Sequence, residues 1–143
     1  MKRFEFKLAR VRDFRRQQLE VEEAKLEVLR AERQALEAGS LRLVNEAAET
    51  RNALRATRPV EAQELVAADR YLHYLAAEEK RQAAKMAEWQ QRTATQQQAM
   101  LEARRRLRLL EKLEEKQLRM WKEEVDREQE NLSAELYLAR WKK

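Results

Sequence analysis

Pro59 and Gly39 are the single proline and the single glycine in a chain of 143 residues. Globular domains need many tight connections, and for that reason they contain roughly 7% glycine and 5% proline. This chain therefore has room for few turns. Charged residues make up 40% of it and aromatic residues 6%, a balance typical of long helices and coiled coils. The sequence predicts an all-α protein.

Apolar residues recur at alternating steps of three and four before the proline. This spacing is typical of a coiled-coil seam, with one additional four-residue step between residues 15 and 19. Gly39 lies inside this run at a cost of about 1 kcal/mol, so we expect no second break there. The apolar members of this first seam are Leu8, Val11, Leu19, Leu26, Leu29, Leu36, Leu43, Ala47 and Leu54.

A second seam follows the proline. Polar residues at Glu79, Gln82, Thr93 and Gln96 weaken its middle. Charge pairs at spacing i,i+4, such as Glu88 with Arg92 and Glu102 with Arg106, each support the helix by about 0.2 to 0.5 kcal/mol. The apolar members of this seam are Leu65, Ala68, Leu72, Leu75, Met86, Trp89, Met100, Ala103, Leu107, Leu110 and, after a change of phase, Leu118, Trp121, Val125 and Leu132.

Pro59 sets the connection between the two seams. A proline costs about 3 kcal/mol inside a helix but is tolerated at the first helical position. We therefore expect one domain over 1–143, with helix one at about 5–56, a turn at about 57–62 and helix two at about 63–140. Each seam needs a partner and the nearest one is intramolecular, which predicts an antiparallel two-helix coiled-coil hairpin.

The second helix is the longer one, so roughly its last 25 residues should overhang the pair. Exposed apolar surface of this kind usually marks a binding surface. Two interpretations follow: the paired chain ends insert into another protein, or the tail frays or pairs with a second copy. The apolar residues concerned are Trp121, Val125, Leu132, Tyr137, Leu138 and Trp141.

Charge is concentrated near the two ends of the sequence. Residues 1–16 hold seven basic and two acidic residues, which equals the whole net charge of +5. Residues 102–122 hold eight basic and four acidic residues, and residues 123–135 then hold six acidic residues and Arg127. Local fields of changing sign suit the choice and orientation of a charged partner.

Two stretches carry a resemblance to a known family. Phe4-Glu5-Phe6-Lys7-Leu8, with Val11 and Arg15, resembles the N-terminal F-x-F-x-L-x-x-V signature of the FliJ family of flagellar export proteins. Glu111-Lys112-Leu113-Glu114-Glu115-Lys116, with Glu123, Arg127, Glu128, Gln129 and Leu132, is similar to that family's E-K-x-x-E and E-Q-x-x-L motifs. The resemblance covers the full length, and it departs at Ser133 and Ala134, where the family often has Asp-Glu.

The resemblance implies a non-enzymatic component of the flagellar type III export apparatus, similar to the central stalk of rotary ATP synthases. Its partners would be the hexameric export ATPase, the cytoplasmic domain of the membrane export gate, and export chaperones. It would be cytoplasmic and peripherally associated with the inner-membrane export apparatus. The residues that match the ATPase-binding end are Phe4, Phe6, Arg10, Arg15, Trp121, Glu124, Arg127, Glu128 and Gln129, and those that match the gate-binding region are Leu43, Tyr71 and Leu75.

Several chemistries are disfavoured by the residues themselves. The chain has no cysteine and one histidine, His73, so neither a disulfide nor a metal site is expected. It has no glycine-rich phosphate loop, and its adjacent carboxylates lack a pocket that would raise a pKa, so we expect no enzyme activity, cofactor or small-molecule substrate. Neither a signal peptide nor a run of about 18 apolar residues is present, which predicts a soluble cytoplasmic protein.

Three alternatives to the flagellar stalk stay open at this point. The same features fit an injectisome stalk protein of type III secretion, or a generic coiled-coil tether or spacer. A nucleic-acid-binding arm is a weaker alternative that rests on the basic cluster at 104–108. Glutamates flank this cluster and no aromatic residue is interleaved with it, so nucleic acid is disfavoured.

Overall fold

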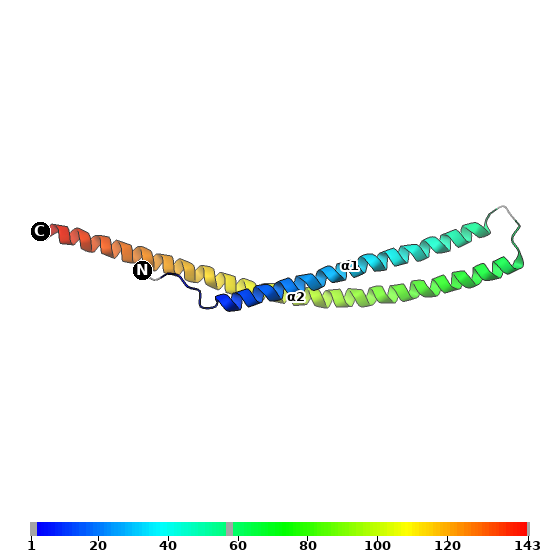
Figure 1. The fold of residues 1–143 in the computed structure, drawn as a ribbon, viewed down its shortest axis with the longest axis horizontal. Helices are drawn as coiled ribbons and strands as arrows, with labels where there is room; N and C mark the ends of the chain where they lie inside the picture. Colours follow the sequence, from blue (N-terminus) through cyan, green and yellow to red (C-terminus); the bar gives the residue numbers. More distant parts are fainter. Residues whose placement is uncertain (1–2, 57–58, 143) are drawn as a thin grey trace. The chain divides into compact units, whose positions relative to one another are not determined.

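The computed structural model describes residues 3–56 and 59–142, which contain two α-helices (Figure 1). Helix α1 spans Ala9–Leu54 and helix α2 spans Ala62–Trp141, 46 and 80 residues respectively. The two helices pack antiparallel and the second is longer. The predicted all-α hairpin is therefore confirmed.

Contacts divide the chain into two compact units. The terminal unit comprises Met1–Val21 with Met100–Lys143, and the turn unit comprises Glu22–Ala99. Both helices contribute to each unit. The assignment of residues 1–143 to a single domain stays a prediction.

A small apolar cluster holds the turn unit together. Leu43, Ala47 and Leu75 are buried, with Leu75 only 1% exposed, and Leu72 packs against them. Each of these positions belongs to a predicted seam, and full burial of one leucine side chain contributes about 1.5 to 3 kcal/mol. Further along the same seams Leu26 and Trp89 are buried. The three-and-four spacing thus identified the packed face of both helices in this unit.

The middle of the second seam is polar, as predicted, and its polar residues lie in the turn unit. Gln96 donates from Nε2 to the backbone carbonyl of Glu22, at 3.2 Å, and to the Glu22 carboxylate. Gln82 lies beside Gly39, and a Cβ at Gly39 would stand 3.6 Å from the Gln82 amide. Among the described residues, Gln82 Oε1 and Thr93 Oγ1 are buried without a hydrogen-bond partner. Packing is therefore weaker here than at the leucine cluster.

The helix ends near the turn follow the expected chemistry. Helix α1 ends at Leu54 with Arg51 in its last turn, where a cation complements the helix dipole. Helix α2 begins at Ala62, three residues after Pro59, with Glu64 in its first turn. Residues 57 and 58 of the predicted turn lie outside the described residues. No helix in the described ranges combines the length and apolar character needed to cross a membrane.

The start of α1 differs from the sequence expectation. The helix begins at Ala9 instead of near residue 5, and the Ala9 amide donates to the Phe6 carbonyl at 3.1 Å. In a helix, residues two positions apart point to different faces. A non-helical segment lets the rings of Phe4 and Phe6 both be covered, and both are at least half-buried.

The first seam also begins later in the sequence than predicted. Leu8 and Val11 are exposed, at 38% and 42%, whereas the neighbouring Arg12 is half-buried. Arg12 takes the position facing α2 because its guanidinium has a carboxylate partner there. The opposite helix supplies Ala103 and Leu107 as the buried seam residues of the terminal unit.

Candidate partner-binding surfaces

An aromatic contact joins the N-terminal segment to α2 within the terminal unit. The ring centroids of Phe4 and Trp121 lie 5.9 Å apart with planes tilted by 52°. Phe6 is buried, and the Arg12 guanidinium carbon lies 5.9 Å from its ring centroid. Tilted aromatic pairs and cation–π contacts each add about 0.5 to 1.5 kcal/mol. These contacts bring an early segment of the sequence beside a late one.

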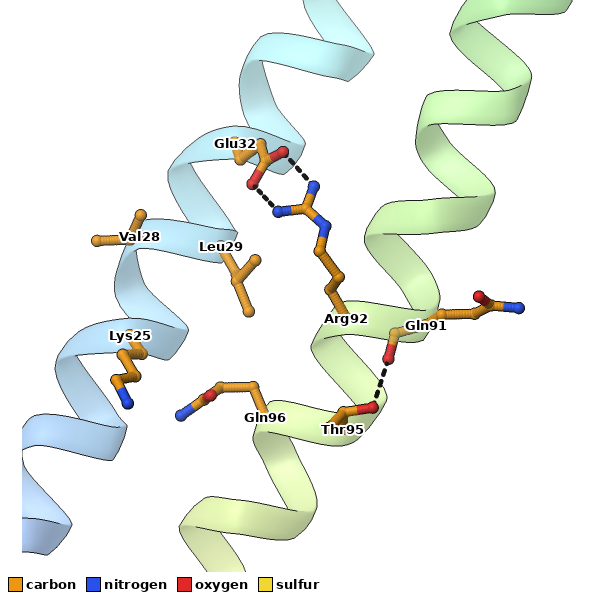
Figure 2. Close-up of a pocket in the computed structure, with 8 residues that line it drawn as sticks. All are labelled: Lys25, Val28, Leu29, Glu32, Gln91, Arg92, Thr95 and Gln96. Carbon is orange, nitrogen blue, oxygen red and sulfur yellow. Dashed lines mark hydrogen bonds and ion pairs between the residues drawn. The ribbon is translucent and has the colours of Figure 1, made fainter.

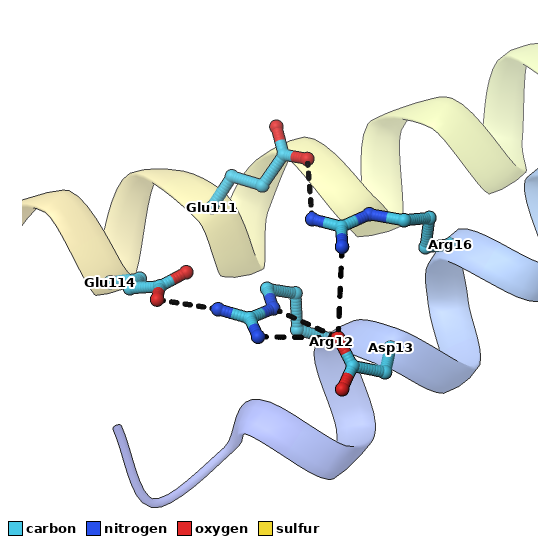
Figure 3. A network of polar contacts seen from close by, with 5 residues as sticks. All are labelled: Arg12, Asp13, Arg16, Glu111 and Glu114. Atoms are coloured by element: carbon cyan, nitrogen blue, oxygen red, sulfur yellow. Dashed lines mark hydrogen bonds and ion pairs between the residues drawn. The ribbon is translucent and has the colours of Figure 1, made fainter. Parts of the chain in front are cut away.

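A polar network joins α1 to α2 in the terminal unit (Figure 3). Arg12 donates from Nη1 to Glu114 on α2, and from Nε and Nη2 to Asp13 at 3.2 Å. Arg16 lies 3.8 Å from Asp13 and 4.0 Å from Glu111, measured nitrogen to oxygen. The hydrogen bond to Glu114 raises the pKa of Arg12 above its ordinary value. The network fixes the alignment of α1 against α2 in this unit.

The nine residues matched to ATPase binding all belong to the terminal unit, and they fall into two groups. Phe4, Phe6, Arg15 and Trp121 are buried or half-buried, and Arg15 donates to Gln18 at 2.9 Å. The other members expose their side chains to solvent, and these are Arg10, Glu124, Arg127, Glu128 and Gln129. The first group therefore packs within the terminal unit, and the second group exposes charged and amide groups to solvent.

Beyond this contact α2 continues with its side chains exposed. Every described residue from 126 to 142 is exposed, and Figure 1 shows this part of α2 extending past the N-terminal segment. Tyr137 and Trp141 lie on one face with ring centroids 6.4 Å apart. The aromatic and aliphatic side chains exposed here are Leu132, Leu136, Tyr137, Leu138 and Trp141. We call residues 126–142 the overhang.

The three residues matched to gate binding belong to the turn unit. Leu43 and Leu75 are 7% and 1% exposed because they pack in its core, so their side chains hold the helices together. Tyr71 is 41% exposed and its ring stacks on that of Tyr74, with centroids 6.2 Å apart. Of the three matched residues, Tyr71 is the one whose side chain is exposed to solvent.

Tyr71 also spans the two helices. Its hydroxyl donates to Glu46 Oε2 on α1 at 2.9 Å. This hydrogen bond to a carboxylate, strengthened by the negative charge of Glu46, raises the pKa of Tyr71. Sequence reasoning did not predict the pairing, because Glu46 is 25 residues away and its approach depends on the register of the two helices.

An open groove lies between the helices of the turn unit (Figure 2). Arg92 donates from both terminal nitrogens to the carboxylate of Glu32, and this bond raises the pKa of Arg92. Lys25, on the other side of the groove, lies 3.5 Å from Glu22. The charged groups that line the groove, Lys25, Glu32 and Arg92, are thus paired within the chain.

His73, the single histidine, lies close to Asp69 on the same helix. Its Nδ1 lies 2.8 Å from the carbonyl oxygen of Asp69 and 3.5 Å from the Asp69 carboxylate. Within residues 3–56 and 59–142, no group of three or more histidine, cysteine, aspartate or glutamate side chains could hold a metal ion.

Of the expectations that the resemblance to the FliJ family raised, the structure supports the coiled-coil-like two-helix hairpin. No protein-family model, curated protein or solved structure gives a significant match to the chain.

Proposed function

We propose that the protein is a non-enzymatic stalk component of a flagellar type III export apparatus, which binds the hexameric export ATPase and links it to the export gate. The observation that carries the proposal is the Phe4–Trp121 contact, which joins the N-terminal segment to α2 at the base of an exposed overhang. The resemblance of both chain ends to the FliJ family supplies the partner class.

The ATPase end is proposed to act through differential binding. Exposed groups of both signs, including Arg10, Glu124 and Arg127, belong to the same unit as the aromatic contact. A stiff helix with unequal charge on its faces makes different contacts with successive subunits of a ring. Such a helix shifts each subunit toward the state that it binds better, and the shift is limited by that difference in affinity.

The gate end is proposed to use the exposed face around Tyr71. The tyrosine ring stacks on Tyr74, so a partner meets two aromatic side chains side by side. Exposed aromatic residues are enriched at the energetic centres of protein interfaces. Leu43 and Leu75 then contribute by keeping the helix under this face in place.

Stimulation of the export ATPase tests the ATPase end. The variant Arg127→Glu with Glu128→Lys changes exposed groups and keeps the net charge, and we expect it to weaken ATPase binding about tenfold. The matched control is Lys80→Glu with Glu79→Lys, a charge exchange on exposed residues of the turn unit. Circular dichroism should show equal helicity for both variants.

Two outcomes contradict the proposal. If the wild-type chain neither binds nor stimulates the ATPase, the protein is a tether or spacer of another system. If both charge exchanges reduce binding equally, the ATPase end is assigned to the wrong unit.

Gate binding is tested with Tyr71→Ala. We expect weaker binding to the cytoplasmic gate domain and unchanged stimulation of the ATPase. Loss of both activities together would mean that the variant disrupts the hairpin. Use of the injectisome ATPase and gate as competing partners separates the flagellar from the secretion version of the stalk.

A further inference from the structure

The stripe of α2 that the N-terminal segment covers continues along the overhang without a cover. Trp121 and Val125 are half-buried, whereas Leu132 and Leu136, on the same face, are 57% and 61% exposed. From Val125 onward, Gln129, Leu132, Leu136 and Ala139 follow at the alternating steps of four and three that are typical of a coiled-coil seam, and Trp121 lies four residues before Val125. The packed interface of the terminal unit therefore runs directly into an unpaired apolar face.

We propose that a second copy of this chain covers this face when the protein is free, with the overhangs of two copies paired antiparallel. The inference rests on the residues of the overhang and does not depend on the proposed export function.

The seam of the overhang is self-complementary in this orientation. In this alignment Leu132 of each copy packs against Leu136 of the other copy. The result is two identical layers, because the two-fold axis passes between positions 132 and 136. The next layer on each side sets Gln129 against Ala139 of the second copy. An isologous interface requires that one patch match itself in this way.

The charges that flank the seam agree with the same alignment. One flank sets Asp126 against Arg140 of the second copy, and the other sets Glu128 against Lys142. Symmetry repeats each pair, which gives four contacts of opposite charge. Glu135 meets its own equivalent as a contact of like charge. Flanking charges of this kind determine partner and orientation in coiled coils.

A parallel pair fits the structure less well. The N-terminal segment lies on the seam at Trp121 in each copy. Parallel overhangs would bring two such segments to the same end of one seam, where they would compete for space. Antiparallel overhangs keep the two N-terminal segments at opposite ends of the seam. The C-terminal end of each overhang then lies next to the N-terminal segment of the other copy.

The expected dimer is weak and sensitive to salt. The overhang is roughly 25 Å long, so its interface falls at the small end of specific interfaces. Exposed ion pairs are screened beyond about 10 Å at 0.1 M salt. Because Glu128 and the Trp121 stripe also belong to the proposed ATPase end, the ring and the second copy would compete for this surface.

Sedimentation equilibrium of the full chain, from about 1 to 500 µM at low salt, tests the inference over the range where small interfaces dissociate. We expect a monomer–dimer equilibrium for the wild type. Asp126→Lys with Glu128→Lys turns four attractions into repulsions, as does Arg140→Glu with Lys142→Glu. Each double variant should weaken the dimer about a hundredfold, since each of the four changes of sign is worth a factor of about three.

Two combinations of these charge reversals decide between the alignments. The quadruple variant that carries all four reversals restores every opposite-charge contact, so it should dimerise like the wild type. An equimolar mixture of the two double variants should form a heterodimer for the same reason. The control variant, Glu123→Lys with Glu130→Lys, changes the net charge equally on the far face and should leave the dimer intact.

Cross-linking checks the alignment independently, because the chain has no native cysteine. In the antiparallel pair Ser133 lies near its own equivalent, while Ala134 points away from the seam. A short thiol cross-linker should therefore join copies of Ser133→Cys much faster than copies of Ala134→Cys.

A monomeric wild type over the whole concentration range overturns the inference. So does a dimer that survives both double variants, or one that the quadruple variant fails to restore. Equal cross-linking of the two cysteine variants also rules out the alignment. All these measurements use the purified chain alone, so their outcome is independent of whether the export ATPase binds.

Discussion

The indole N–H of Trp89 on α2 donates a hydrogen bond to the backbone carbonyl of Leu29 on α1, 2.6 Å away. The guanidinium carbon of Arg33 lies 5.4 Å from the centroid of the same indole. Trp89 is 7% exposed, so both contacts form where water is largely excluded. One side chain therefore joins the two helices through packing, a hydrogen bond and a cation–π contact.

Trp89→Phe should lower the free energy of unfolding by about 1 to 2 kcal/mol. The substitution keeps an aromatic ring but removes the donor and weakens the contact with Arg33. Urea unfolding followed by circular dichroism measures the change. Trp141→Phe, at a position 75% exposed, is the control and should change stability by less than about 0.5 kcal/mol. Equal effects of the two substitutions would contradict the assigned contacts.

Leu75→Ala should be the more severe change, with a loss of about 2 to 5 kcal/mol. Leu75 is the most buried side chain of the turn unit, and its removal leaves a cavity beside Leu43 and Ala47. Leu65→Ala, on the same helix at 50% exposure, is the comparison and should cost far less. The difference in urea midpoints between the two variants is the measurement. A loss below about 1 kcal/mol at position 75 would mean that the cluster is not packed as described.

Gly39→Ala should stabilise the protein by about 1 kcal/mol, because alanine favours the helix over glycine and restricts the unfolded chain. The new methyl group would stand 3.6 Å from the Gln82 amide, an ordinary van der Waals distance. Thermal unfolding should show a higher midpoint. A lower midpoint would show that helix α1 needs the space beside Gln82.

Tyr71 should titrate at higher pH than an ordinary tyrosine, because its hydrogen bond to the Glu46 carboxylate favours the neutral hydroxyl. Its pKa is raised in the folded state, so the contribution of this bond to stability is fully present below the ordinary tyrosine pKa. That contribution is lost as the pH rises through the folded-state pKa. Glu46→Gln should bring the pKa of Tyr71 back toward its ordinary value.

Alkaline titration of tyrosine ionisation, monitored by absorbance, tests this shift. Subtraction of the curve of Tyr71→Phe isolates the signal of Tyr71. An unchanged titration of Tyr71 in the Glu46→Gln variant would show that the carboxylate does not cause the shift.

The sequence was sufficient to predict the faces that pack. Leu26, Leu43, Leu75, Trp89 and Leu107 are all buried at predicted seam positions, because apolar spacing along a helix is local information. The start of helix α1 was predicted wrongly, because periodicity over four or five residues does not distinguish a helix from an extended segment. The helix starts at Ala9, and Leu8 is exposed.

Contacts between the helices were harder to predict than the faces. The pair Glu102 with Arg106 forms as predicted, at 3.2 Å, because both residues belong to one helix. Arg92 was expected to pair with Glu88, yet its hydrogen bonds go to Glu32 across the hairpin. That choice depends on the alignment of residues 60 positions apart, which no local pattern specifies.

The candidate partner-binding residues also divide into features that the sequence predicts and features that it does not. Residue types at both ends could be matched from sequence, but their exposure could not. Leu43 and Leu75 were matched to gate binding and lie in the core, while the neighbouring Tyr71 faces outward. Whether a seam leucine meets solvent or the other helix is settled by packing, which the sequence pattern describes only as a preference.

The contact between Gln96 and Glu22 has a consequence for how the hairpin closes. If α2 slid past α1 by one heptad, leucines would still meet leucines along much of the length, but the amide of Gln96 would face Leu29. A buried polar group without a partner costs about 1 to 3 kcal/mol. This pair therefore acts against misaligned hairpins, and it favours one alignment of two helices whose apolar seams could otherwise pack in more than one.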